Sequence, residues 1–152
     1  MFEVVYCSSL GNTRKVAEAI AAQLGVTAKD VKTAGVLPLD AFIFIGTGCY
    51  RGELPAELKA FLRKNMFPGR KIALFTTSVF GFKTERRKIE RQVEDSGAVI
   101  VRNFDCYGRL LDINKVHPDW LDLKKAAWFA RSASLTLFTP QLETAEFVSL
   151  VS

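Results

Sequence analysis

The sequence predicts an α/β protein built on a five-stranded, doubly wound parallel sheet with helices on both faces. Two observations predict it. Five short apolar segments alternate with helical patterns along the 152 residues, and these segments are apolar throughout rather than at every second position. Continuous apolar runs such as 41–46 and 71–77 are typical of strands that are covered on both faces. In such a sheet, ligands bind at the carboxyl ends of the strands.

The first half of the chain predicts three strands and one helix, in the order strand 2–7, helix 12–24, short strand 28–33 and strand 41–46. Val16, Ile20 and Leu24 recur at four-residue spacing, which gives the helix one apolar face. Gly25 follows as a residue that ends a helix easily.

The second half predicts a helix from Pro55, a strand at 71–77, a helix from Thr84 to Ser96 and a strand at 98–104. Proline suits the first turn of a helix, and threonine is a common N-cap. The buried face of the first of these helices is expected at Leu54, Leu58, Phe61 and Leu62. Ile89 and Val93 are the main apolar positions of the second, so we expect it to be exposed on one side.

A last helix is expected from Pro118 to about Arg131, with core contacts from Leu121, Leu123, Ala127 and Trp128. These elements place one domain at residues 1–131 and a C-terminal extension at 132–152. The extension does not continue the alternating plan, although "SLTLFTP" has the pattern of an edge strand. Two roles stay open for it: mediating a homodimer, or covering an edge of the sheet.

The composition narrows the range of functions. Net charge is +5, but the basic residues are interleaved with acidic ones and no recognition motif accompanies them, so nucleic acid is not expected as a partner. No apolar run is long enough to span a bilayer, and the sequence "MFEVVYCSS" has no basic-then-apolar leader. These features predict a soluble cytoplasmic protein.

Three cysteines at irregular spacing do not form a disulfide framework, and a single histidine makes a zinc site improbable. We therefore expect no metal. Cys7, Cys49 and Cys106 all fall at the ligand edge of the predicted sheet, where they are either small buried hydrophobes or redox-active thiols. His117, before Pro118, is expected to be a structural cap rather than a catalytic base.

The segment "CSSLGNT" joins the first strand to the first helix and has the composition of a phosphate-binding loop. A helix N-terminus offers unpaired N–H groups and partial positive charge, and Gly11 allows the backbone to approach an anion closely. The side chains expected to add donors are those of Ser8, Ser9, Asn12 and Thr13. No Walker lysine and no G-x-G-x-x-G are present. The alternative is that these polar residues merely cap the helix.

This opening segment resembles that of the flavodoxins, whose loop binds the phosphate of FMN. Ser8, Gly11, Asn12 and Thr13 match the family's Ser/Thr-x-Thr-Gly-x-Thr pattern, whereas Leu10 stands where the family usually has a threonine. "DAFIFIGTGCYRGELPAELKAFL" and "RKIALFTTSVFGF" are similar to the two flavin-flanking regions of the same family. The resemblance implies the strand order 2-1-3-4-5 and FMN as the cofactor.

The resemblance also implies two loops around the flavin ring. Tyr50 is the expected aromatic neighbour in the first loop, and Phe80, with Phe82 in reserve, in the second. The other contacts, mainly through the backbone, are expected from Thr47, Gly48, Cys49, Arg51, Gly52, Thr77, Ser78 and Gly81. Arg51 stands where several flavodoxins have glycine.

The leading function that the resemblance implies is electron transfer between redox protein partners. Two alternatives stay open: an FMN-dependent reductase or quinone-linked oxidase of the protoporphyrinogen-oxidase type, and a non-redox binding module. The segment "KTERRKIERQVED" is either a solvated face or a docking surface for an acidic partner.

Overall fold

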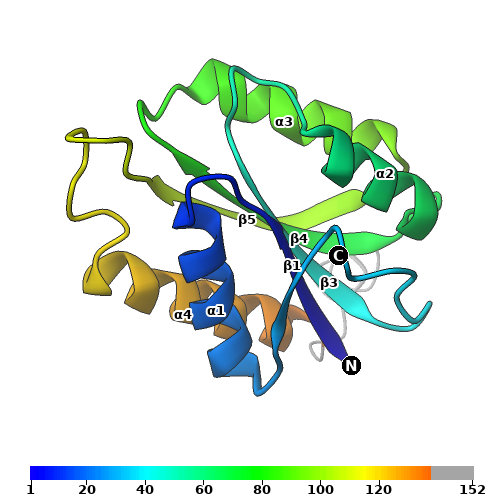
Figure 1. Cartoon of the computed structure of the whole chain (residues 1–152). Helices are drawn as coiled ribbons and strands as arrows, with labels where there is room; N and C mark the ends of the chain where they lie inside the picture. The colour runs from blue at the N-terminus through cyan, green and yellow to red at the C-terminus, as the bar shows by residue number, and fades with distance from the viewer. Residues whose placement is uncertain (138–152) are drawn as a thin grey trace, which may run out of the picture.

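The computed structural model describes residues 1–137 and has the predicted doubly wound α/β fold (Figure 1). Its elements are β1 (Phe2–Cys7), α1 (Asn12–Leu24), β2 (Ala28–Asp30), β3 (Phe42–Gly48), α2 (Ala56–Asn65), β4 (Lys71–Ser78), α3 (Lys83–Asp95), β5 (Val99–Tyr107) and α4 (Trp120–Thr136). The strands form one sheet in the order β2-β1-β3-β4-β5, and every pair of neighbours is parallel. The predicted strand order is confirmed.

The sheet is covered on both faces, as Figure 1 shows. Helices α2 and α3 pack on one face through Leu58, Phe61 and Ile89, which join a cluster that includes Ile43 and Ile72. Helices α1 and α4 pack on the other face, in a second cluster with Val4, Phe44 and Phe75 from the strands. Because consecutive strand residues point to opposite faces, each central strand contributes to both clusters, which explains its continuous apolar run.

Helices α1, α2 and α3 agree closely with the prediction. Helix α1 spans the expected residues, with Gly25 in the left-handed conformation as its C-cap. Pro55 is the N-cap of α2, and Ile89 and Val93 are the buried residues of α3. The predicted cap of α3 is wrong, because the helix starts one residue earlier, at Lys83, with Phe82 at the N-cap position.

Helix α4 differs most from the prediction. It starts at Trp120, behind an Asp119–Asp122 capping box, and not at Pro118. It continues to Thr136, so the predicted end near Arg131 is wrong.

The predicted core contacts of α4 are also largely wrong. Trp128 is 74% exposed and Leu121 is exposed, while Leu123 and Ala127 are half-buried. The buried stripe is instead Ala126, Phe129, Ala130 and Ala133. Three alanines let the helix approach the sheet closely, and the ring of Phe129 fills the space between Phe44 and Phe104.

The start of the predicted edge strand "SLTLFTP" belongs to α4, because residues 134–136 are helical. Residues 138–140 of that segment, and with them most of the expected extension 132–152, lie outside the described residues. No helix in the part of the chain that the structure describes is both long and apolar enough to cross a membrane.

Candidate functional site

The loop between β1 and α1 leaves the N-terminus of α1 open. Gly11 is the N-cap residue, with φ of 85°, and within the described chain no side chain caps this helix. The hydroxyl of Ser8 accepts a hydrogen bond from the N–H of Gly11 at 3.0 Å, which closes the turn before the helix. The first helical turn contains no acidic residue. The alternative that the polar residues merely cap α1 therefore does not hold, and the N–H groups of the first turn have no side-chain cap.

Asn12 and Thr13, which we expected to donate to a phosphate, hold the loop in place instead. The hydroxyls of Thr13 and Thr77 form a buried hydrogen bond of 2.8 Å that joins α1 to β4. The side-chain amide of Asn12 donates to the carbonyl of Arg109 at 2.9 Å. Both side chains are buried, so they fix the N-terminus of α1 against the strand ends. The side chains left to contact a phosphate are those of Ser8 and Ser9.

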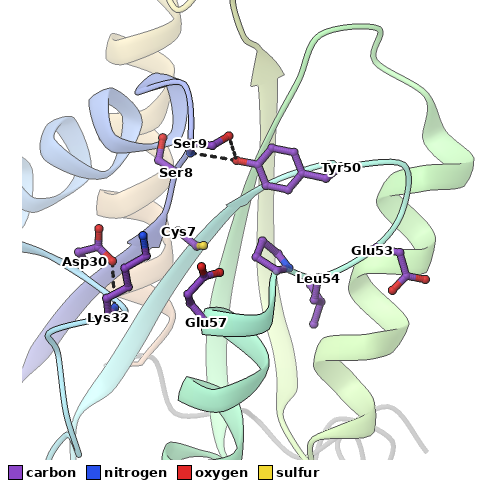
Figure 2. Close-up of a pocket in the computed structure, with 10 residues that line it drawn as sticks. Cys7, Ser8, Ser9, Asp30, Lys32, Tyr50, Glu53, Leu54 and Glu57 are labelled. Atoms are coloured by element: carbon purple, nitrogen blue, oxygen red, sulfur yellow. Dashed lines mark hydrogen bonds between the residues drawn. The ribbon is translucent and has the colours of Figure 1, made fainter.

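Tyr50 reaches from the loop after β3 to the loop between β1 and α1. Its hydroxyl accepts hydrogen bonds from the backbone N–H of Ser9 at 3.2 Å and from the Ser9 hydroxyl at 3.1 Å, as Figure 2 shows. Gly48 makes room for the ring, because a Cβ there would lie 2.7 Å from it. The tyrosine hydroxyl thus occupies donors that a phosphate oxygen would use.

The first loop ends in a tight turn at residues 50–53. The N–H of Glu53 donates to the carbonyl of Tyr50 at 3.0 Å, and both central residues, Arg51 and Gly52, have positive φ values of 53° and 77°. This pattern is a type I′ turn. Arg51 therefore adopts a backbone conformation that favours glycine, as the comparison with flavodoxin loops suggested.

Two cavities meet at the Tyr50 side chain. One, of about 150 Å³, is lined by Ser8, Leu10, Asn12, Thr13, Gly48, Cys49, Tyr50, Thr77, Ser78, Val79, Gly108 and Leu110. The other, of about 380 Å³, lies toward β2 and α2 and is lined by Cys7, Ser8, Ser9, Asp30, Lys32, Tyr50, Glu53, Leu54, Pro55 and Glu57 (Figure 2). The smaller cavity is below the ~300–1,000 Å³ typical of ligand pockets. Tyr50 thus divides a larger space at the carboxyl edge of the sheet.

Some predicted site residues lie outside the smaller cavity. Thr47 is buried behind it, and Arg51 and Gly52 form the turn beyond Tyr50. The rings of Phe80 and Phe82 stack on each other, with centroids 5.7 Å apart, and are 59% and 55% exposed. Gly81 joins them, with its N–H bound to the Ser78 hydroxyl. From this loop, Val79 lines the smaller cavity in the place where we expected Phe80.

The loop after β5 is the part of the site that sequence reasoning missed. Gly108 donates its N–H to the carbonyl of Ser78 at 3.0 Å, and a Cβ on Gly108 would lie 2.7 Å from the Asn12 amide nitrogen. Asn114 donates to the carbonyls of Val79 and Gly108 at 2.7 and 3.2 Å, which ties this loop to the loop after β4. The sequence feature that could have indicated this loop is Gly108, which directly follows a strand that ends at the ligand edge of the sheet.

All three cysteines are free thiols. Burial, aided by the carboxylates of Glu57 and Asp30, raises the pKa of Cys7 to about 11. Burial also raises the pKa of Cys49 to about 11 and that of Cys106 to about 12. Because the thiolate is the reactive form, protonated thiols at neutral pH favour the interpretation of the cysteines as small packing residues.

His117 belongs to the start of α4. Its Nδ1 lies 2.6 Å from a carboxylate oxygen of Asp122, and this hydrogen bond raises the pKa of the imidazole. His117, Asp119 and Asp122 offer ligand atoms within 4.8 Å of one another. The two aspartates already form the capping box, so the cluster is explained by the helix start.

The fold and the open N-terminus of α1 define a class: doubly wound α/β proteins with an uncapped helix N-terminus at the carboxyl edge of the sheet. A family model for the flavodoxin domain matches residues 3–117. The chain therefore belongs to the flavodoxin family.

One curated relative and two solved structures are similar to this chain. An uncharacterized protein of Methanocaldococcus jannaschii is 28% identical over 133 residues, which cover 80% of this chain and 89% of the relative. The crystal structure of oxidised flavodoxin 2 from Bacillus cereus matches with a TM-score of 0.65 and 20% identity, covering 89% of this chain and 98% of that one. A flavodoxin from the domain Archaea matches with a TM-score of 0.64 and 19% identity, covering 91% and 99%. At these identities the two structures support the fold.

Proposed function

We propose that the protein binds FMN noncovalently and transfers electrons between redox proteins. The observation that carries the proposal is the open N-terminus of α1, because Leu10, Asn12 and Thr13 at this helix start line the smaller cavity together with residues of the neighbouring loops. An anion site beside a divided cavity suits a ligand with one terminal phosphate and a flat ring. The membership in the flavodoxin family supports the same cofactor.

In this proposal the phosphate is held by the backbone N–H groups of α1 and by the hydroxyls of Ser8 and Ser9. Tyr50 is the aromatic neighbour of the ring, because it is the aromatic residue that lines both cavities. Gly48, Cys49 and Ser78 line the smaller cavity, and their backbone groups would contact the polar edge of the ring. The flavin, when bound, supplies one- and two-electron redox chemistry, and the protein orients it.

The test is reconstitution. The purified protein is mixed with excess FMN and passed over a desalting column, and its visible spectrum is recorded before and after anaerobic photoreduction. We expect bound, reducible flavin in about equal amount to protein. A colourless protein that does not quench FMN fluorescence would contradict the proposal and favour the non-redox binding module.

A second candidate function is an FMN-dependent reductase or quinone-linked oxidase. The cavity of about 380 Å³ beside Tyr50 favours it, because this space is large enough for a small substrate. The reconstituted protein distinguishes the two functions: an enzyme turns over with a quinone as acceptor and no protein partner, whereas an electron carrier needs a redox protein on each side.

We also propose a cytoplasmic location. Three free thiols at the edge of the sheet support a reducing compartment, where thiols persist.

A further inference from the structure

A basic surface lies beside the candidate flavin cavity. It consists of Arg51 at the tip of the first loop and Lys83, Arg87, Lys88 and Arg91 on α3, all of them exposed. Lys83, Arg87 and Arg91 follow one another at four-residue spacing and so share a stripe of the helix. The two parts are adjacent, because a Cβ on Gly52 would lie 2.7 Å from the Cδ of Lys88, and Gln92 donates to the carbonyl of Gly52.

Neighbouring carboxylates cancel the positive charge of the basic surface only in part. Arg86, on the side of α3 that faces β5, pairs with Asp105 at 2.9 Å and Glu90 at 3.8 Å. Glu53, next to Arg51, pairs with Lys59 at 3.7 Å. Among residues 1–137, by contrast, no ion pair involves any of the five cations of the basic surface. Glu85, Glu94 and Asp95 on α3 take part in none of these pairs either, and the surface keeps a net positive charge because its five exposed cations outnumber these three carboxylates.

An apolar pair borders this surface. Phe80 and Phe82, directly before Lys83, stack on each other with more than half of each ring exposed. Protein interfaces combine an aromatic centre with a charged rim. The two phenylalanines supply the centre here, and the stripe on α3 supplies the rim.

The opposite side of Tyr50 carries the other charge. The carboxylates of Asp30, Glu53 and Glu57 line the larger cavity, toward β2 and α2, and outnumber the cation Lys32 in the same lining (Figure 2). An acidic partner is therefore attracted to the α3 side of the site and repelled from the β2 side, which fixes its orientation.

We propose that the basic surface and the Phe80–Phe82 pair dock an acidic redox protein. This inference rests on the proposed electron transfer and names the charge of the partner and the side from which it approaches. Carboxylates of the partner face Lys83 and Arg87, and its apolar centre covers the two phenylalanine rings. One electron then passes between the flavin and the redox centre of the partner, so that one is oxidised as the other is reduced.

The test uses two haem proteins as probes: cytochrome b5, which is acidic, and cytochrome c, which is basic. The photoreduced, FMN-loaded protein is mixed with each oxidised cytochrome, and haem reduction is followed by stopped flow at low and high ionic strength. The Lys83→Glu/Arg87→Glu variant should reduce cytochrome b5 about tenfold more slowly at low ionic strength and cytochrome c faster. High salt should remove most of the difference.

The matched control is Arg63→Glu/Lys71→Glu, which makes the same change in net charge at the other edge of the sheet, at the C-terminal end of α2 and the start of β4. It should change either rate by less than about twofold, because salt screens charges across the molecule. Equal effects of the two variants would show a net-charge effect and overturn the docking surface.

A second measurement needs no flavin and so separates this inference from the proposed function. Cytochrome b5 is titrated into the isotope-labelled protein, and backbone resonances are followed at low salt. Shifts should concentrate at residues 80–91 and at Arg51, and the Lys83→Glu/Arg87→Glu variant should abolish them. Shifts elsewhere, or none at all, would overturn the inference even if FMN binding and reduction are normal.

Discussion

Replacing Tyr50 by phenylalanine tests whether the tyrosine competes with the phosphate of the cofactor. The Tyr50 hydroxyl accepts two hydrogen bonds from Ser9, from the backbone N–H and from the hydroxyl. A phosphate that takes the same donors must displace this oxygen. Tyr50→Phe removes the acceptor and keeps the ring, so the competition disappears while the aromatic neighbour of the flavin remains.

The size of the effect follows from these two contacts. Their lengths, 3.2 and 3.1 Å, and the exposure of Ser9 place them at the weak end of the range of roughly 0.5–1.5 kcal/mol per hydrogen bond. Together they contribute about 1 kcal/mol to the free protein. Because about 1.4 kcal/mol corresponds to a tenfold change in affinity, Tyr50→Phe should bind FMN about fivefold more tightly. Riboflavin, which has no phosphate, should gain less.

The assay is titration of FMN and of riboflavin by fluorescence quenching, at one pH and one ionic strength. Tyr107→Phe is the matched control, because it makes the same chemical change at the end of β5. Unchanged or weaker FMN binding by Tyr50→Phe would refute the reasoning and show that hydroxyl and phosphate share the Ser9 donors. An equal gain for riboflavin would show that the ring, and not the phosphate, displaces Tyr50.

Three further predictions concern the supports of the site. Thr13→Val leaves the buried Thr77 hydroxyl without its partner and should lower the free energy of unfolding by about 1–3 kcal/mol in denaturant titrations. The double variant Thr13→Val/Thr77→Val should lower the free energy of unfolding by less than the sum of the two single changes. Gly108→Ala should weaken FMN binding in the fluorescence titration, because the added methyl group displaces the Asn12 amide, and unchanged affinity would contradict this. His117→Ala should lower stability more at about pH 5 than at about pH 9. Because folding raises the pKa of His117, the stabilisation is fully present at pH values below the ordinary histidine pKa and is lost as the pH rises through the raised pKa. Equal losses of stability at both pH values would argue against this reasoning.

Much of the fold follows from local sequence. The apolar runs of β3 and β4 are buried on both faces, and Gly25 ends α1 where the left-handed conformation is needed. Helix α4 shows where local patterns fail. Its stripe of alanines around Phe129 has little hydrophobic contrast, so the bulky Trp128 attracted the prediction although it faces solvent. The phase of such a helix is set by the shape of the sheet beneath it.

The site was predictable where a single segment carries it. The loop from Ser8 to Gly11 is an example, because its glycine and small polar residues indicate an open helix N-terminus. The partners of Thr13 and Asn12 are 64 and 97 residues away, and no local pattern indicates them. We expected Phe80 to face the cavity. The direction of its side chain depends on how the loop after β4 is held, and Asn114 from the loop after β5 holds that loop at the carbonyl of Val79.

If FMN and an acidic partner bind as proposed, the charges beside the cavity link partner binding to the redox potential of the flavin. Arg51 and Lys83 flank the two flavin loops, and positive charge stabilises a reduced, anionic flavin. The midpoint potential of the free holoprotein should therefore lie above that of a flavodoxin with acidic residues around its ring. When carboxylates of an acidic partner neutralise Arg51 and Lys83, part of this stabilisation is lost, and the potential should fall. The same cations that attract the partner would then make the docked flavoprotein a stronger electron donor than the free one. Raising the ionic strength should also lower the midpoint potential of the free holoprotein, as partner binding does, because salt screens the same charges.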